Sequence, residues 1–483
     1  MEKVNTTVQQ KYNALQQPLA LVISISLSVA SCAQFQDRQL KPSESIGRIE
    51  TRTLSDTNLK QFINTALNQD DGQPIPLWNL DRLSLAAIYY HPDLALARAQ
   101  ADTASAAITT AGQRPNPNVL LSPTWVTNLA AAATPWIIAA NINLPIETAG
   151  KRGFRLDKAK HQTNAARLRI TDAAWLVRGR LRVALLEVYA ATETVRLLKQ
   201  QLGIQQSIMQ RLEQQRSVGE IGPLEITRSN IAVKQLQLNA SAAHKRAAES
   251  RVLLATAIGI PVEGLDGIAL DFTPLASPPN MKSLAVAQLK QQALLHRPDI
   301  LAALADYAAA QATLQLEIAN QYPNIQVNPG YTFDLGANYW SLGATALQLP
   351  IFHQNQGLIA EAEAKRQESA VRFEALQLRI LGDIDKAHAG VAAVMAKWDA
   401  AEQQIHIGQD NLDTLQSLTK LGETDQLALL GAQLEAAVTE RARFDVLVET
   451  QQALNVLEDS LRIPLASTFS TALIANSANK KNP

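Results

Sequence analysis

The chain has 483 residues, with 44 Lys and Arg balanced by 44 Asp and Glu and with aromatic residues at only 5%. A balanced charge argues against a nucleic-acid-binding protein, which usually carries a basic surplus, and the single cysteine excludes an intrachain disulfide and a cysteine metal cluster. A chain so poor in aromatic residues is typical of long helices packed through small side chains.

Residues 1–31 are similar to a bacterial signal peptide. Two lysines precede a short apolar run, 19–29, and small residues then lead to Cys32. The run falls short of the roughly 20 residues that a membrane-spanning helix needs, which favours a secretory signal. Because Ala30-Ser31-Cys32 is similar to a lipobox, we expect the signal to be removed before Cys32 and this cysteine to carry lipid. An ordinary signal peptide followed by an incidental cysteine is the alternative.

Residues 32–82 are predicted to be a lipidated linker with a short helical segment. Ala33 follows the cysteine at the position where bacterial lipoproteins kept at the inner membrane commonly carry aspartate, so its identity favours the outer membrane. No later segment approaches about 20 apolar residues. A mature protein that crossed a membrane would therefore have to do so as a β-barrel.

The sequence from residue 83 onward consists of two similar halves, 83–265 and 284–465, with a Pro-rich connector at 266–283 and a flexible tail at 466–483. Short motifs recur in the same order at an offset that falls from 206 residues (Pro92 to Pro298) to 203 residues (Pro261 to Pro464). We interpret this as duplication of one structural unit, because the period is too long for a solenoid. The recurring motifs include His91-Pro92-Asp93 and Arg297-Pro298-Asp299, Pro117-Asn118 and Pro323-Asn324, Leu144-Pro145-Ile146 and Leu349-Pro350-Ile351, and Gly219-Glu220 and Gly422-Glu423.

Each half is predicted to begin with an Ala-rich helix, at 83–113 and 284–321, followed by two strands. The strands are expected at about 118–128 and 135–148 in the first half and at about 324–334 and 338–351 in the second. Apolar residues such as Val327, Tyr331 and Phe333 alternate with polar ones, which is the pattern of a strand with two different faces. Each segment is close to the roughly 9–11 residues that a tilted strand needs to cross a bilayer.

Very long helices are predicted next, at 156–217 and 358–420. Each is followed, after a Gly-Glu break, by a second long helix that ends near residue 259 or 461. Leu181, Leu185 and Val188 belong to a heptad-like apolar seam along the first of them. The seam alone would favour a plain coiled-coil rod, and the strand pairs argue against that interpretation.

Pro145 and Pro350 lie in equivalent motifs where each strand pair gives way to a helix. Both are predicted to be strand-to-helix corners, because proline lacks an N–H and disfavours helix in the preceding residue. Four strands cannot close a barrel, and lipid does not tolerate open strand edges, so several copies must complete the circle. Two copies would give a filled interior, whereas three would leave an aqueous lumen. We therefore expect a homotrimer whose polar strand faces line water and whose apolar faces contact outer-membrane lipid.

The breaks at Gly219-Glu220 and Gly422-Glu423 are predicted to be reversals between long helices. Glycine gives the backbone the freedom that such a turn requires. Both tips should lie at the end of the molecule farthest from the strands, where they would contact a periplasmic adaptor.

This order of elements, present twice, resembles the TolC-like outer-membrane efflux protein family over about residues 83–465. The motifs that carry the resemblance are those around Pro117, Pro145 and Gly219 and their second-half counterparts. The resemblance implies a mainly α-helical fold in which a trimer forms a twelve-stranded membrane β-barrel and a periplasmic α-barrel. It also implies a passive conduit for small molecules or metal ions, working with a periplasmic adaptor and an inner-membrane pump. The segment Tyr89-Tyr90-His91-Pro92-Asp93 looks most like the heavy-metal efflux branch.

One feature of the family is missing from this chain. The positions at which some members close the periplasmic end with carboxylates correspond here to Ala428 and Gly431, so an aspartate gate cannot be carried over. Asp425 and Glu423, which lie nearby, are interpreted as residues of a solvated helix turn.

No catalytic or cofactor-binding pattern is found in the sequence. Gly150-Lys151 lacks the rest of a phosphate-binding loop, and no two of the seven histidines are three or four residues apart, as metal ligands on one helix face would be. We therefore expect no enzyme, no cofactor, no metal site and no nucleic-acid partner. A non-conducting, structural coiled-coil envelope lipoprotein is the alternative function.

Overall fold

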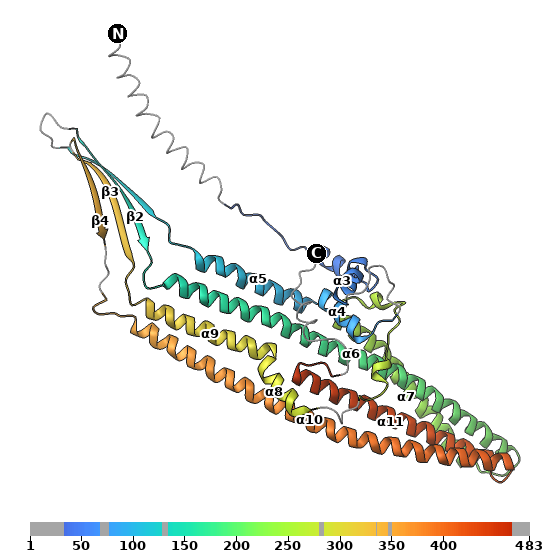
Figure 1. Cartoon of the computed structure of the whole chain (residues 1–483). Coiled ribbons are helices and arrows are strands. Elements are labelled where there is room, and N and C mark those ends of the chain that lie inside the picture. Colours follow the sequence, from blue (N-terminus) through green and yellow to red (C-terminus); the bar gives the residue numbers. More distant parts are fainter. Residues whose placement is uncertain are drawn as a thin grey trace. The chain divides into compact units, whose positions relative to one another are not determined.

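The computed structural model describes residues 33–67, 77–127, 134–279, 285–334, 336–345 and 350–465 (Figure 1). Cys32, the predicted signal peptide and the predicted C-terminal tail lie outside the described residues. The chain divides into two compact units, Met1–Thr51 and Arg52–Pro483. The described part of the first unit contains the helix α2 (Pro42–Glu50), which has no buried side chain.

The described part of the second unit is mainly helical and contains one small antiparallel sheet, which confirms the predicted fold class at this level. After α3 (Thr57–Leu67), the first half comprises α4 (Leu80–Tyr90), α5 (Pro92–Gly112), β1 (Asn118–Trp125), β2 (Trp136–Ile146), α6 (Lys151–Ser217) and α7 (Pro223–Ile258). Two short 3-10 helices, η1 (Val262–Leu265) and η2 (Thr273–Leu275), follow. The second half comprises α8 (Val286–His296), α9 (Pro298–Ala319), β3 (Ile325–Asp334), β4 (Ala337–Thr345), α10 (Gln356–Leu421) and α11 (Gln426–Leu461).

The first predicted helix of each half is two helices, separated at a proline. Pro92 and Pro298 are the first residues of α5 and α9, and the residues before them, His91 and Arg297, are extended with ψ of 130° and 136°. A proline ring disfavours helical backbone in the preceding residue and supplies no N–H to continue the earlier helix. The prediction of single helices at 83–113 and 284–321 was wrong for this reason.

The long helices of the second unit lie side by side in a layer, with the strands at one end (Figure 1). Helix α6 packs against α5 and α9 on the strand side, and against α7 and α11 toward the opposite end. Helix α10 packs against α9 and α11 and forms one margin of the layer. Only five of its 66 residues are buried, so most of this helix is exposed along its whole length.

The core lies around the middle of α6. Trp175, Leu181 and Leu185 are fully buried there, against α3, α4 and the end of α7. A second cluster joins Ile380 and Ile384 of α10 to the end of α11. Buried alanines are common in the long helices of both halves. These small side chains let the helices approach closely, as the sequence composition predicts.

The sheet has the strand order β1-β2-β3-β4, and all neighbours are antiparallel. Each half contributes one hairpin, and the pairing of β2 with β3 joins the two halves. The strands start within one residue of the predicted segments. The fourth strand is shorter than predicted, because β4 ends at Thr345 and neither Pro350 nor Ile351 belongs to a strand.

Candidate functional site

The strand register divides the sheet into two chemically different faces. Residues paired across antiparallel strands point to the same side, and side chains alternate along each strand. Leu121 pairs with Ala140, Ala140 with Tyr331, and Tyr331 with Trp340, which gives one row across the sheet. The alternation places the following residues on the same face as this row: Val119, Leu121, Pro123, Trp125, Trp136, Ile138, Ala140, Ile142, Leu144, Ile146, Ile325, Val327, Pro329, Tyr331, Phe333, Asn338, Trp340, Leu342 and Ala344. We call this the apolar face, since Asn338 is its only amide and it carries no charge.

The opposite face is polar and rich in small residues. Asn141 pairs with Leu120 and with Gly330, and Gly330 pairs with Ser341. The polar face comprises Asn118, Leu120, Ser122, Thr124, Ile137, Ala139, Asn141, Asn143, Pro145, Gln326, Asn328, Gly330, Thr332, Asp334, Ala337, Tyr339, Ser341 and Gly343. Its amides interact across strands, as in the 3.2 Å hydrogen bond that Asn143 Nδ2 donates to Gln326 Oε1.

Large apolar side chains are exposed on the apolar face of the single chain. Leu121, Ile142 and Leu342 are among them, and Trp340 is 84% exposed. Trp125 and Trp136 pair at the end of the sheet where the first hairpin turns, with ring centroids 4.7 Å apart, and Tyr331 and Trp340 pair nearer its middle, with centroids 5.0 Å apart. An outward apolar band bordered by aromatic residues is the pattern of strands that face lipid.

The two outer strands have open edges. Within the described chain, β1 pairs only with β2, and β4 pairs only with β3. Unpaired N–H and C=O groups along such edges are a template for pairing with another strand. The sheet is therefore chemically incomplete in one copy of the chain.

The connection from the first hairpin to α6 differs from the predicted corner at Pro145. Pro145 lies inside β2 and is paired with Gln326, so the turn comes later. Ala149 and Gly150 make that turn with φ of 55° and 73°, immediately before α6. Beyond Asn143, β2 has no partner in β1, so Pro145 has a neighbouring strand on one side only, where a missing N–H is tolerated and need not end the strand. Pro350 lies in the connection between β4 and α10.

Buried polar contacts fix this junction. Lys151 Nζ donates hydrogen bonds to the backbone oxygen of Tyr322 at 2.6 Å and to Asn324 Oδ1 at 2.8 Å. Burial lowers the pKa of Lys151 from its usual range, and Glu147 opposes that shift. In the second half, Asn355 has a φ of 60° and donates to Glu317 Oε2 at 2.9 Å. Lys151 thus ties the start of α6 to the segment that leads into β3, and Asn355 ties the start of α10 to α9.

Both helix tips have the same turn geometry. Gly219 and Gly422 have φ of 81° and 76° and end α6 and α10. The N–H of Glu220 donates to the oxygen of Gln215 at 2.9 Å, and that of Glu423 donates to the oxygen of Leu418 at 3.0 Å. This is the glycine-capped helix end in which the residue after glycine bonds back across the last turn.

The two tips lie at the same end of the second unit, opposite the strands (Figure 1). Arg211 Nη2 near the end of α6 lies 3.8 Å from Asp425 Oδ1 at the start of α11. Asp425 therefore forms an exposed ion pair between the tips, and both Asp425 and Glu423 are exposed, as expected of a solvated helix turn. Ala428 and Gly431 are helical residues of α11.

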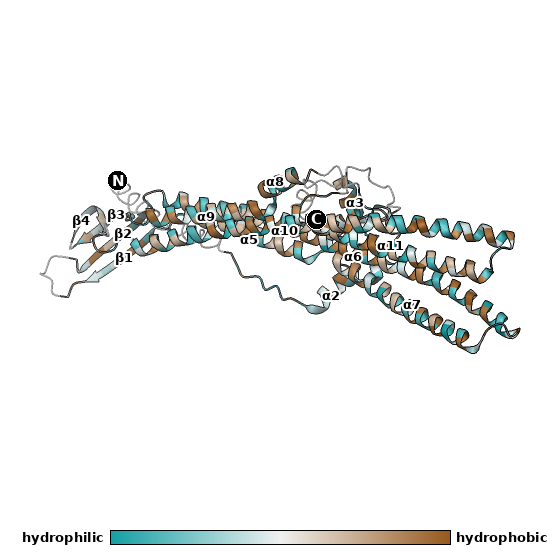
Figure 2. Cartoon of the chain, turned by 90° about the horizontal axis from the view of Figure 1, so that it is seen from below, coloured by the Kyte–Doolittle hydropathy of each residue, from teal (hydrophilic) through white to brown (hydrophobic). Residues whose placement is uncertain are grey.

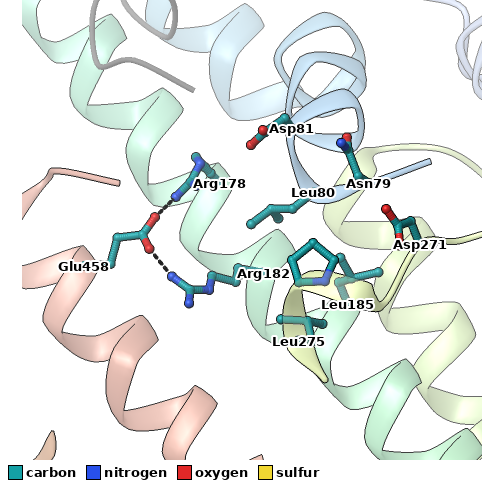
Figure 3. Close-up of a pocket in the computed structure, with 10 residues that line it drawn as sticks. Asn79, Leu80, Asp81, Arg178, Arg182, Leu185, Asp271, Leu275 and Glu458 are labelled. Carbon is teal, nitrogen blue, oxygen red and sulfur yellow. Dashed lines mark hydrogen bonds and ion pairs between the residues drawn. The ribbon is translucent and has the colours of Figure 1, made fainter. Parts of the chain in front are cut away.

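A buried ion-pair group links the two halves midway along the layer (Figure 3). The guanidinium groups of Arg178 and Arg182 on α6 both bind the carboxylate of Glu458 on α11, and all three side chains are at most 5% exposed. They line a cavity of about 210 Å³ together with Asn79, Leu80, Asp81 and Asp271. Sequence reasoning did not identify this group. Its signal was present, because Arg178 and Arg182 are four residues apart on one helix face, in line with the buried Leu185.

The described part of the chain contains no candidate membrane-spanning helix and no candidate metal cluster. None of the helices in that part of the chain is both long and apolar enough to cross a membrane, and Figure 2 shows hydrophobic and hydrophilic residues mixed along each long helix. In the same residues, no three His, Cys, Asp or Glu side chains are grouped so that they could hold a metal ion.

Comparisons with known proteins agree with this arrangement. A family model described as outer membrane efflux protein matches residues 84–260 and 289–461. The pyoverdine export outer membrane protein OpmQ of Pseudomonas aeruginosa is 29% identical over 288 residues, which are 57% of this chain and 55% of that protein. The cobalt-zinc-cadmium resistance protein CzcC of Cupriavidus metallidurans is 22% identical over 321 residues, which are 66% of this chain and 75% of that protein.

The fold is similar to that of solved channels. The structure of the outer-membrane channel OprN superposes with a TM-score of 0.64, covering 89% of this chain and 98% of that one at 18% identity. At this identity the likeness concerns the fold alone. The alignment with OpmQ spans only about half of that relative, 55% of its length.

Proposed function

Because the chain belongs to the outer membrane efflux protein family, we propose that it forms, as a homotrimer, the outer-membrane channel of a tripartite export system. The channel would carry small molecules or metal ions passively to the exterior and would catalyse no reaction of its own. A periplasmic adaptor and an inner-membrane pump would supply the cargo and the energy.

The observation that carries this proposal is the two-faced sheet with open edges. Lipid requires an apolar surface without unpaired backbone groups, and water requires a polar one. Three copies, with β1 of one copy pairing with β4 of the next, would satisfy every strand edge and enclose the polar faces. The apolar faces would then contact lipid around the whole circumference.

The margins of the helix layer support the same assembly. Helix α7 exposes Leu224, Ile231 and Leu238 at every seventh position, on the side away from α6. Helix α10 exposes Leu378, Ile407 and Leu421. Apolar residues at heptad spacing on an unpartnered helix favour packing against another helix. In the proposed trimer, the α5 and α7 margin of one copy packs against α10 of the next.

The tips at Gly219-Glu220 and Gly422-Glu423 are the proposed adaptor contact. They lie together at the end opposite the strands, and their turns expose both glutamates to solvent. Cysteines placed at Glu220 and Glu423 should crosslink to the adaptor in cells, whereas a cysteine at Ala337 by the hairpin turn should not. Crosslinks confined to Ala337 would contradict this orientation.

The relatives do not narrow the cargo to one class. The name of OpmQ refers to pyoverdine, and that of CzcC refers to cobalt, zinc and cadmium. The proposal for this chain therefore stays at small molecules or metal ions, and the heavy-metal branch remains one case within it.

The decisive experiment is conductance of the full-length protein purified from outer membranes. We expect a trimeric mass in detergent and stepwise conductance in planar bilayers. A monomer, or an oligomer that never conducts, would instead support the structural coiled-coil lipoprotein. A Cys32→Ala chain in the same assay should lose lipid labelling and still form conducting trimers, because the sheet provides its own contact with lipid.

A further inference from the structure

Formal charge is almost absent from the strand segments. Between Arg114 and Glu147 the sequence contains no Asp, Glu, Lys or Arg. Between Glu317 and Glu361 it contains one such residue, Asp334. A single carboxylate in two long uncharged segments stands out, because a charge in a membrane-embedded strand is costly unless it faces water.

The strand register locates Asp334 on the polar face. It is the last residue of β3 and pairs with Ile137 of β2 and Ala337 of β4, so it lies at the hairpin end of the sheet. Thr332, two residues earlier on the same strand, points to the same face. Asp334 is half-buried, and within the described chain its Oδ1 accepts no hydrogen bond. No Lys or Arg in either strand segment is present to neutralise it.

We propose that Asp334 is the residue that determines ion preference at the outer mouth of the channel. The inference rests on the proposed trimer, in which three copies of Asp334 form a ring where the polar faces end. The rest of the polar wall is uncharged, so this ring dominates the local potential. Rings of carboxylates favour cations in channels. The ring would raise the local concentration of metal ions and protonated amines and disfavour anionic solutes.

The size of the effect follows from distance and screening. A single carboxylate about 10 Å from a passing ion acts on it only weakly in water. Three of them, partly screened at about 0.1 M salt, would change the ratio of cation to anion permeability by about twofold or more. At about 1 M salt the screening length falls to about 3 Å, and the preference should nearly disappear.

The test is the reversal potential of reconstituted channels in a potassium chloride gradient. We expect the wild type to prefer cations, Asp334→Asn to lose the preference, and Asp334→Lys to prefer anions. Asn338→Asp is the matched control, because it places a carboxylate beside the same hairpin turn on the apolar face. It should leave selectivity unchanged, whereas Thr332→Asp, on the polar face, should increase it.

A second measurement uses channels that have already inserted. Asp334→Cys channels treated with a negatively charged thiol reagent should regain cation preference, and a positively charged reagent should reverse it, with no response in the wild type. If wild type, Asp334→Asn and modified Asp334→Cys all conduct with the same selectivity, the proposed role of Asp334 is wrong, while the proposed channel still stands. A wild type that never conducts would overturn the proposed channel and this inference with it.

Discussion

The backbone of Gly179 in α6 lies directly against the carboxylate of Asp459 in α11. A β-carbon added at Gly179 would lie 2.6 Å from each carboxylate oxygen of Asp459, which is closer than such atoms can approach. Glycine inside a helix is otherwise unfavourable, so its presence here reflects the close approach of the two helices. The contact joins the first half of the chain to the second.

We predict that Gly179→Ala destabilises the folded protein by about 1–3 kcal/mol, because Asp459 must be displaced within a packed interface. Gly203→Ala is the matched control, since it changes an exposed glycine of the same helix with open space around its β-carbon position. That change should be neutral or stabilising, because alanine favours helix. Thermal unfolding of both variants in detergent measures the difference. Equal stability of the two variants would show that the Asp459 side chain moves aside without lowering the stability of the protein.

The buried group formed by Arg178, Glu458 and Arg182 should stabilise the fold only when all three side chains are present. Glu458→Gln leaves two guanidinium groups without their carboxylate in a buried site, and we expect a loss of about 3–5 kcal/mol. Joint replacement of all three by apolar residues of similar size should recover much of that loss. Lys365→Gln provides the comparison, because its ion pair with Glu361 is exposed and screened by solvent and should contribute little to stability. If Lys365→Gln lost as much stability as Glu458→Gln, the buried group would be no more important than an exposed ion pair.

The carboxyl of Asp459 should make stability depend on pH. Burial raises the pKa of Asp459, with the nearby Glu458 acting in the same direction and Arg462 opposing it. The folded protein therefore takes up this proton at a higher pH than the unfolded chain does. The contribution of the Asp459 proton to the free energy of unfolding is therefore present at acid pH. It is lost as the pH rises through the raised pKa of Asp459.

Asp459→Asn should accordingly be more stable than the wild type near neutral pH. The advantage should shrink as the pH falls through the raised pKa of Asp459, because the wild-type side chain then also becomes neutral. Unfolding measured across this range for both proteins gives the difference directly. A constant difference at every pH would mean that the protonation of Asp459 is not linked to folding.

Charge at the two faces of the sheet should have opposite consequences. Tyr331 lies on the apolar face near the middle of the sheet, paired with Ala140. We expect Tyr331→Lys to cost about 2–4 kcal/mol and to reduce trimers in the outer membrane. Asn328→Lys, on the polar face of the same strand, should assemble normally. Quantifying folded trimers extracted from membranes tests this, and equal yields would contradict the assigned faces.

The features predicted correctly from the sequence are those set by local chemistry. The alternation of Tyr331 and Phe333 with polar neighbours depends on the strand itself, and the turn at Gly219 depends on one residue that can adopt positive φ. The break at Pro92 was also local, and it was missed because the alanine-rich sequence on both sides favours continuous helix. The placement of Pro145 failed because a proline is acceptable inside a strand where that strand has a neighbour on one side only.

Contacts between residues far apart in the sequence could not be predicted in this way. The pairing of Ile146 with Ile325 decides that the two hairpins share one apolar and one polar face, and no local pattern specifies that pairing. The same holds for Arg182 and Glu458, which are brought together only when α6 packs against α11. Asp334 could have been singled out as the only charge in its segment, but its face became clear only from the register.

The glycine at the tip between α10 and α11 should be required for export. Gly422 has a φ of 76°, a conformation in which a β-branched side chain is strained by about 1–2 kcal/mol. We therefore expect Gly422→Val to distort the turn, displace Glu423 and abolish export, while trimers remain in the outer membrane because the strands are unaffected.

Gly422→Asn should retain most activity, since asparagine also occurs at this helix-end position. Gly431→Ala, in the neighbouring helix with open space around it, should export normally. Export of a toxic substrate by cells that carry each variant, with trimer levels measured in parallel, separates the outcomes. Normal export by Gly422→Val would show that the geometry of this tip is not needed for contact with the adaptor.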